Sequence, residues 1–236
     1  MGNLTSLIST TPTYETVLPT SKQRVSYRPF LVKEEKILLI ASESKNEKEI
    51  SRAMNDVVSA CTFGKVNMQE SSIIDIEYLF LQIRSKSVGE TTKPMVKCKK
   101  CNTTNEVQID LTKIQPVVNP NHSSKIQLTD SVIVEMRYPK FSDIEKLQDA
   151  KTETQKIFLL MSLCVEKIYT KSGTFNSNDL EQKDIVDFID NLTQMQFKKM
   201  TEFFESMPQM KYDVNYSCGK CGNQEILTLK GAQDFF

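Results

Sequence analysis

Apolar residues recur at helical spacing in the first part of the chain. After Pro29, the segment Lys33–Leu39 begins like a helix. The next apolar stripe repeats every three or four residues and consists of Ile50, Met54, Val57, Val58 and Cys61. Phe63 and Gly64 interrupt this pattern, and the sequence predicts a further helix over residues 72–85. Residues 27–91 are therefore predicted to form an N-terminal helical region.

Residues 1–26 have a different character, because they are rich in Ser, Thr and Pro and show no sustained periodicity. Such a composition is typical of segments that bury too little apolar surface to fold by themselves. We expect an extended or disordered N-terminal arm, a kind of segment that can order on a partner.

Residues 92–140 have the pattern of short strands. Val107–Leu111 and Val132–Met136 carry the alternation and the β-branched residues of strands. The polar loop between them contains His122, the single histidine of the chain, and a histidine in such a loop is expected to be solvent-exposed. We expect a small sheet in this region.

Helical spacing returns over residues 141–210. Ser142, with Glu145 three residues later, has the pattern of a capping box at a helix start. The apolar residues expected on these helices include Ile144, Leu147, Phe158, Leu159, Met161, Leu163, Val165 and Ile168. Further helices are predicted over residues 179–192 and 193–207, the second ending before Pro208. Residues 211–236 are expected to form a closing β-hairpin.

Four of the six cysteines form two distant pairs with the same spacing. Cys98 and Cys101 enclose two lysines, and Cys218 and Cys221 enclose Gly-Lys. Two intervening residues let the chain turn so that both sulfurs face one point, as tetrahedral Zn²⁺ requires. Two such knuckles supply four thiolates and leave no position for water or substrate. The spacing predicts one structural zinc site that joins residues 92–140 and 211–236 in one compact unit.

Redox chemistry and disulfide bonding are the two alternatives to zinc at these cysteine pairs. A redox-active CxxC is usually single and begins a helix, whereas strand-like segments follow both pairs here. Disulfides are typical of secreted proteins, and no secretory signal is expected at the start of this sequence. Cys61 and Cys164 lie on apolar stripes and are expected to be small core residues.

The predicted fold class is α+β, with a helix-rich body and a small antiparallel β zinc-ribbon module formed by two distant CxxC knuckles. Thirty basic residues balance thirty acidic ones in the 236-residue chain, so net charge gives no general attraction to nucleic acid or to a membrane. No apolar run approaches the ~20 residues of a membrane-spanning helix, and a soluble protein is expected.

The sequence offers little enzymatic chemistry. It has one histidine and shows no Gly-rich phosphate loop, nucleophile elbow or metalloprotease motif, so we expect a protein that is not an enzyme. A zinc-ribbon nucleic-acid binder stays an alternative, although residues 224–229 carry no stripe of basic and aromatic side chains.

Several segments follow one another in a recognisable order. They are Tyr27–Ser44, a CxxC followed by Val-x-Ile-Asp-Leu, a strand ending at Tyr138–Phe141, Phe203–Pro208, a second CxxC, and a terminal Asp-Phe-Phe. In this order they resemble the T4-type bacteriophage baseplate hub and hub-assembly proteins. Tyr27–Ser44 is similar to the leading motif of that family, and the resemblance covers nearly the whole chain from Tyr27.

This resemblance implies a non-enzymatic assembly factor, or chaperone, for the central hub of a contractile-tail phage baseplate, made late in infection in the host cytoplasm. A permanent structural subunit of the hub in the virion is the alternative that the resemblance leaves open. The implied partners are other hub proteins, with the tape-measure protein and further copies of this chain as additional candidates.

Two segments are candidate partner contacts. They are Arg28, Pro29, Phe30 and Lys33 near the N-terminus, and Asp234, Phe235 and Phe236 at the C-terminus. For Pro29 and Phe30 a role in starting a helix and anchoring it in the core is favoured. The planar guanidinium of Arg28 can clamp a carboxylate or a helix C-terminus in this chain or in a neighbour. The terminal aromatic residues either pack on the ribbon or dock into a partner groove.

Overall fold

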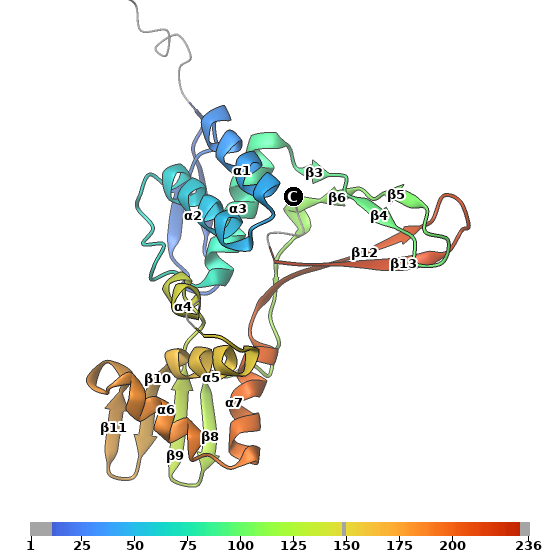
Figure 1. The fold of residues 1–236 in the computed structure, drawn as a ribbon. Coiled ribbons are helices and arrows are strands. Elements are labelled where there is room, and N and C mark those ends of the chain that lie inside the picture. The colour runs from blue at the N-terminus through green and yellow to red at the C-terminus, as the bar shows by residue number, and fades with distance from the viewer. Residues whose placement is uncertain (1–10, 148–149, 232–236) are drawn as a thin grey trace, which may run out of the picture. The chain divides into compact units, whose positions relative to one another are not determined.

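The computed structural model describes residues 11–147 and 150–231. The described chain divides into two compact units (Figure 1). The first unit contains residues 11–68, 74–116 and 209–231, and the second contains residues 69–73 and 117–208. The chain thus leaves the first unit at residue 116 and returns to it for its last two long strands.

The first unit begins with a β-hairpin. Strands β1 (Tyr14–Val17) and β2 (Arg24–Tyr27) pair antiparallel. The Ser- and Thr-rich turn between them is held by the buried carboxylate of Asp75, which accepts hydrogen bonds from the amides of Thr20 at 2.8 Å and Ser21 at 3.1 Å. Part of the segment expected to be an unfolded arm is therefore a folded hairpin, because its polar turn has a buried partner. Residues 1–10 of that expected arm lie outside the described residues.

Three helices pack with this hairpin. They are α1 (Val32–Ser44), α2 (Glu47–Cys61) and α3 (Ile73–Val88). Helix α2 carries the apolar stripe that ends at Cys61. Its N-cap is Asn46, whose side chain accepts a hydrogen bond from the amide of Lys48 at 3.0 Å. Leu79, Phe80 and Ile83 of α3 are fully buried, so α3 provides much of the hydrophobic core of this unit.

Short antiparallel strand pairs complete the first unit. They are β3 (Thr91–Thr92) with β6 (Ile109–Asp110), β4 (Met95–Lys97) with β5 (Thr104–Glu106), and β12 (Gln209–Ser217) with β13 (Gln224–Lys230). The short helix η2 (Leu111–Lys113) and strand β7 (Pro116–Val117) follow β6. Each of the hairpins β4–β5 and β12–β13 has a CxxC pair at its turn.

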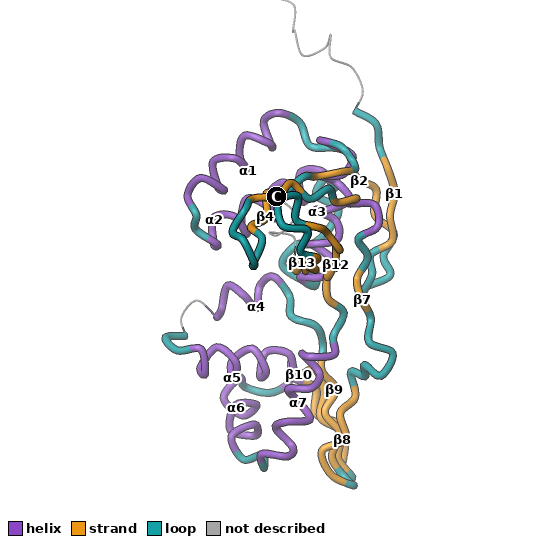
Figure 2. The backbone as a smooth tube through the Cα atoms, turned by 90° about the vertical axis from the view of Figure 1, so that its right-hand side faces the viewer, coloured by secondary structure: helices purple, strands orange, loops and turns teal. Residues whose placement is uncertain are grey.

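The second unit is a four-stranded antiparallel sheet with three longer helices on one face (Figure 2). The sheet order is β11-β10-β9-β8. Its strands are β8 (Lys125–Thr129), β9 (Val132–Met136), β10 (Val165–Thr170) and β11 (Gly173–Asn176). Its helices are α4 (Phe141–Lys146), α5 (Glu153–Cys164), η4 (Ser177–Asp179), α6 (Gln182–Asp190) and α7 (Gln194–Ser206). No helix in the described ranges is long and apolar enough to cross a membrane.

Strands β10 and β11 lie where the sequence predicted further helix. Val165 and Ile168, expected on a helical face, are inward-facing residues of β10 that join the core of the second unit. Val165, Ile168, Tyr169 and Thr170 are residue types that are frequent in strands. This preference is realised because β9 has a free edge with which β10 pairs. The expected capping box at Ser142 is wrong, because α4 starts at Phe141 and its N-cap is Lys140, two residues before Ser142.

Residues 117–140 were expected beside the metal but belong to the second unit. Strands β8 and β9 direct Ile126, Val134 and Met136 into the core under the helices, and this burial fixes their place in the sheet. His122 is half-buried and not free in solvent. Its ring lies 5.5 Å from that of Tyr138, and its Nδ1 is 2.9 Å from the hydroxyl of Ser206. Burial lowers the pKa of His122.

Candidate metal centre

The four knuckle cysteines meet at one point of the first unit. Their Sγ atoms all lie within 4.8 Å of one another. The sulfurs of Cys98 and Cys221 are 3.8 Å apart, and those of Cys101 and Cys218 are 3.5 Å apart. A tetrahedral site with Zn–S bonds of about 2.3 Å places its sulfurs about 3.8 Å from one another. The cluster therefore has the size of a four-thiolate zinc site.

The two knuckles have the same backbone turn. In each, the amide of the first cysteine donates to the carbonyl five residues later, Thr103 or Asn223, at 2.9 Å. The residue after the second cysteine, Asn102 or Gly222, donates back to the first cysteine at 2.9 Å. Asn102 and Gly222 have φ of 56° and 65°, in the left-handed region that Gly and Asn adopt at low cost. The sequence thus places a suitable residue at the same point of both turns.

Backbone amides point at the first sulfur of each knuckle. The amides of Cys221 and Lys220 donate to Cys218 and lower the pKa of its thiol to about 6. Burial raises the pKa of Cys98 to about 12, although the amides of Cys101 and Lys100 oppose that shift. Amide donors stabilise a thiolate, so the turns favour the ionised sulfurs that a metal ion requires, whereas burial opposes ionisation at Cys98.

Two side chains connect one knuckle to the other. The carboxylate oxygen Oε1 of Glu225 accepts the amide of Lys99 at 2.9 Å, and Oδ1 of Asn105 accepts the amide of Gly219 at 3.0 Å. Oε1 of Glu225 also lies 3.2 Å from the sulfur of Cys98. Each hairpin therefore supplies an acceptor for the turn of the other hairpin, and these contacts orient the ligands from outside the coordination shell.

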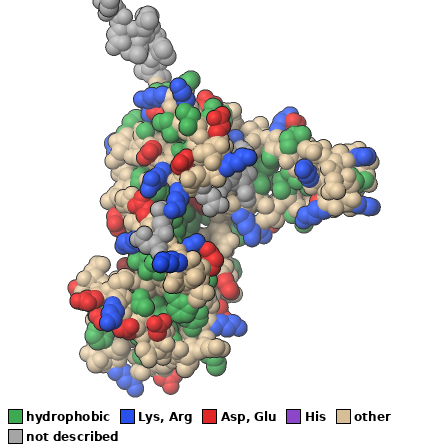
Figure 3. All heavy atoms as spheres, in the orientation of Figure 1, with side chains coloured by type: hydrophobic (Ala, Val, Ile, Leu, Met, Phe, Trp, Pro, Cys, Tyr) green, Lys and Arg blue, Asp and Glu red, His purple; other side chains and the backbone are tan. Residues whose placement is uncertain are grey.

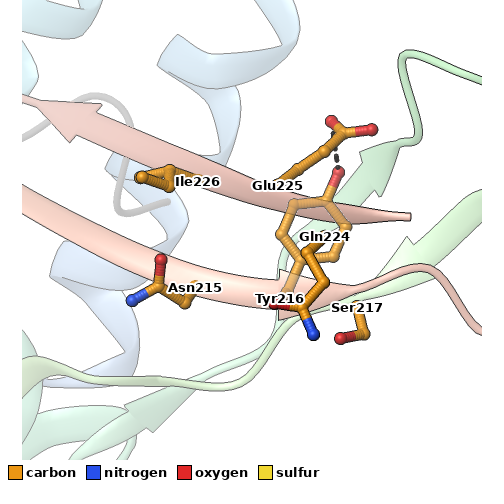
Figure 4. A pocket seen from close by; sticks show the side chains of 6 residues that line it. All are labelled: Asn215, Tyr216, Ser217, Gln224, Glu225 and Ile226. Atoms are coloured by element: carbon orange, nitrogen blue, oxygen red, sulfur yellow. Dashed lines mark hydrogen bonds between the residues drawn. The ribbon is translucent and has the colours of Figure 1, made fainter. Parts of the chain in front are cut away.

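Glu225 is itself held by several donors. Figure 4 shows the hydroxyl of Tyr216 directed at this carboxylate, at 3.1 Å from Oε2, and the amide nitrogen of Asn223 donates to Oε1 at 2.8 Å. Burial raises the pKa of Glu225, but its donors outweigh burial and hold the pKa below its ordinary value. A depression of about 380 Å³ beside these residues is lined by Asn215, Tyr216, Ser217, Gln224, Glu225 and Ile226.

The donor set fits Zn²⁺ in a structural role. Four thiolates at tetrahedral spacing fill its coordination shell and leave no position for a water or a substrate. Such a site carries net negative charge, and Lys99, Lys100 and Lys220 lie exposed on the two turns, where their ammonium groups offset it. Cys98, Cys101, Cys218 and Cys221 would hold the ion, which would supply a cross-link between the two hairpins.

Sequence reasoning missed Asn105 and Glu225. Each lies seven residues after the first cysteine of its own pair. That shared position was the available signal, because the spacing of the cysteines alone says nothing about which polar side chain on the following strand reaches across. The other two cysteines of the chain, Cys61 and Cys164, are fully buried.

Arg28 forms a clamp within this chain. Its Nη2 lies 3.0 Å from Oε1 of the buried Glu34, and its Nη1 donates to the carbonyl of Pro29 at 2.9 Å. Oε2 of Glu34 accepts the amide of Leu31 at 2.6 Å at the start of α1. The arginine therefore fixes the first turn of α1.

The remaining N-terminal candidate residues lie at the start of α1 and are not part of the cysteine cluster. Pro29 is buried, Phe30 is half-buried, and the side chain of Lys33 is exposed and lies 3.6 Å from Glu34. The amide of Phe30 donates to the hydroxyl of Ser87 at 2.9 Å. The C-terminal candidates Asp234, Phe235 and Phe236 lie outside the described residues.

A family model described as "T4 bacteriophage base plate protein" matches residues 11–236. The chain belongs to this family. The comparison with curated proteins and the comparison with solved structures each gave no match. As a baseplate protein of the T4 type, the chain associates with other baseplate proteins and with the phage tail.

Proposed function

We propose that this baseplate protein is a non-enzymatic assembly factor for the central hub of the baseplate. It binds hub proteins, and the tape-measure protein is a further candidate partner. The observation that carries the proposal is the apolar surface of α1, where Val32, Leu39 and Ile40 are 80%, 60% and 58% exposed. Figure 3 displays hydrophobic side chains at the surface of the molecule. Exposed apolar residues that share one helix are typical of surfaces that bind another protein.

The cysteine cluster supports a structural role for the metal. A filled thiolate shell supplies neither an activated water nor a Lewis-acid position. In this proposal Zn²⁺ joins the β4–β5 and β12–β13 hairpins and contributes stability to the first unit. The protein would then act by presenting surfaces to partners, without catalysing a reaction.

A permanent hub subunit is the second candidate function, and the family description as a base plate protein favours it. Quantitative mass spectrometry of purified tails, compared with infected-cell lysate and combined with affinity capture, separates the two candidates. An assembly factor is captured with hub proteins from the lysate and is absent from finished tails. A fixed copy number in finished tails would replace the first candidate by the second.

The contribution of α1 can be tested in the same capture experiment. Replacing Val32, Leu39 and Ile40 together by serine should abolish capture of hub proteins and leave the unfolding temperature nearly unchanged, because these side chains are exposed in the free protein. Met195→Ser is the matched control, since Met195 is 79% exposed on α7. Equal capture by the triple variant and the wild type would exclude α1 as the binding surface.

A further inference from the structure

The second unit contains an arginine clamp like that of Arg28. Nη1 and Nη2 of Arg137 lie 2.6 and 3.0 Å from the two carboxylate oxygens of the buried Asp143. Asp143 also accepts the amide of Lys140 at 2.8 Å, at the start of α4. The pair fixes the first turn of α4 as Arg28 and Glu34 fix that of α1.

The two clamps share four contacts, although Arg137 contacts both carboxylate oxygens of Asp143 and Arg28 contacts one oxygen of Glu34. In both, the acid follows the arginine by six residues and accepts the amide three residues before itself. In both, Nη1 donates to the carbonyl of the next residue, at 2.9 Å to Pro29 and at 3.1 Å to Tyr138. The arginine amide donates to the carbonyl of a buried cysteine, at 3.0 Å to Cys61 and at 2.8 Å to Cys164. Four equivalent contacts at the same spacing define one motif.

The elements around the clamps also match. A β-hairpin precedes each arginine, β1–β2 in one unit and β8–β9 in the other. Two helices follow, and the second ends at the cysteine that bonds the arginine amide. Farther along the chain, a CxxC hairpin follows in each case. The motif of hairpin, arginine clamp and helix pair therefore occurs twice in this chain.

The two copies differ after the cysteine. In the second copy Cys164 leads directly into β10, which pairs with β9. In the first copy Cys61 leads into a turn, where Phe63 and Gly64 have φ of 59° and 66°. Among the described residues, no strand directly follows Cys61. In the second copy β10 lies beside β9, but at the equivalent place beside β2 the described part of the chain has no strand.

The backbone of β2 offers hydrogen-bonding groups at this edge. The amide of Leu18 donates to the carbonyl of Gln23 across the hairpin. Because hydrogen-bonded pairs alternate along an antiparallel ladder, the amides and carbonyls of Val25 and Tyr27 point at β1. Arg24 and Ser26 direct their amides and carbonyls to the opposite side, where no backbone hydrogen bond is made within the described part of the chain. Glu135 is the equivalent of Ser26 in the second copy, and it is paired there with Lys167 of β10.

We propose that the free edge of β2 binds one antiparallel strand of another baseplate protein, in the position that β10 occupies in the second copy. This partner rests on the proposed assembly function, whereas the edge itself does not. Main-chain hydrogen bonds to Arg24 and Ser26 supply the attraction, as in other cases where a peptide adds a strand to a sheet.

The second copy also indicates the chemistry of the incoming strand. Val165 is paired with Met136 and Ile168 with Val134, and all four side chains are buried. The equivalents of Met136 and Val134 in the first copy are Tyr27 and Val25, which are 2% and 4% exposed. By analogy with β10, we expect the incoming strand to carry two apolar residues separated by two others, as in Val-Glu-Lys-Ile. A second copy of β2 fits less well, because it carries Arg24 and no acidic residue and would place arginines on neighbouring strands.

A tethered strand tests the edge without any hub protein. The probe is the full chain with the sequence of Val165–Thr170 added before residue 1 through a flexible Gly-Ser linker, which gives an effective concentration on the order of mM. Hydrogen exchange of the Arg24 and Ser26 amides is expected to slow by at least about tenfold. The same extension with both apolar residues replaced by aspartate should give no protection. If the apolar probe does not slow exchange of these two amides, the edge of β2 is not a docking site for a strand.

A proline pair provides the matched control. Ser26→Pro removes a donor that points away from β1, so the isolated protein should keep its unfolding temperature and lose the probe-dependent protection. Glu135→Pro, at the equivalent position, removes a donor beside β10 and should destabilise the second unit. Equal destabilisation by both variants would show that the β2 edge is already filled. In hub assembly intermediates that contain the protein, slow exchange at Arg24 and Ser26 supports a partner strand, and fast exchange contradicts it. Protection that grows with protein concentration in the purified protein alone would assign the edge to a second copy.

Discussion

Asn105 and Glu225 occupy equivalent positions on two hairpins and act on each other's hairpin. Each lies seven residues after the first cysteine of its pair, and each accepts the amide that follows the first cysteine of the other pair. The amides belong to Gly219 and Lys99. The two knuckles are thus joined by protein contacts beside the point where the four sulfurs meet, with approximate two-fold symmetry.

These two acceptors should set the affinity of the site for zinc. Removing either by Asn105→Ala or Glu225→Ala is expected to weaken Zn²⁺ binding by about 10- to 100-fold, because the ligand turns lose an orienting hydrogen bond. Competition with a chromophoric chelator measures the change, and Co²⁺ spectra report whether the tetrahedral geometry persists. Gln224→Ala is the control, since Gln224 is an exposed neighbour on β13. Unchanged affinity in both variants would show that the cross-knuckle contacts do not position the ligands.

The cysteines should behave as one site in a double-mutant cycle. Cys98→Ser and Cys221→Ser are expected to lower the free energy of unfolding by similar amounts, and the double variant should cost far less than their sum. Each single change already disrupts the shared metal site, so the second change has little left to remove. Cys61→Ala changes a buried cysteine outside the cluster. Combined with Cys98→Ser or with Cys221→Ser, it should lower the free energy of unfolding by the sum of the two single effects. Full additivity between Cys98 and Cys221 would argue for separate roles.

Metal removal should act on one part of the protein. Chelation of the zinc-loaded protein is expected to increase hydrogen exchange in β4, β5, β12 and β13, since the cross-link between these hairpins is lost. The sheet β8–β11 should keep its protection because the four clustered cysteines lie outside its hydrophobic core. A thermal transition that is unchanged after complete metal removal would contradict a stabilising role of the metal.

The clamp of the second unit should contribute to its acid stability. Burial raises the pKa of Asp143, but Arg137 and the amide of Lys140 outweigh it and hold the pKa below its ordinary value of 3.8. A depressed pKa gives stability that is present above the ordinary value and is lost as the pH falls through the lower, folded-state value. Asp143→Asn should therefore cost about 3 kcal/mol at neutral pH and show a weaker loss of stability below about pH 4.

Acid titration of the second unit by circular dichroism measures this difference. Glu202→Gln, at an exposed position of α7, serves as the control and should leave the acid transition where it is in the wild type. An Asp143→Asn variant with the same acid dependence as the wild type would show that Arg137 and Asp143 do not govern it.

Local sequence signals predicted the elements that depend on local chemistry. The apolar stripe ending at Cys61 corresponds to α2, and the interruption at Phe63 and Gly64 corresponds to a turn with positive φ. Equal spacing in the two CxxC pairs was enough to predict that four sulfurs converge, because the turn that brings two sulfurs together is encoded within six residues.

Elements that depend on distant partners could not be predicted in this way. The turn of the β1–β2 hairpin is polar, and residues 1–26 alone do not indicate that the distant Asp75 accepts hydrogen bonds from its amides. Val165 and Ile168 suit a helix face or a strand, and pairing with β9 decides between them. Ser142 and Glu145 have the capping-box spacing, but Arg137 recruits Asp143 and moves the helix start. In each case a tertiary contact outweighs a local preference.

The long separation between the two knuckles constrains the order of folding. The sulfurs of Cys98 and Cys221 are 123 residues apart along the chain, and a cross-link that closes a loop of this size removes about 5 kcal/mol of chain entropy from the unfolded state. Contacts of such long range form late, whereas the four strands of the β8–β11 sheet have all their strand partners inside that loop. We expect the second unit to acquire its structure first and metal uptake to come at the end, so that zinc occupancy reports whether a molecule has finished folding.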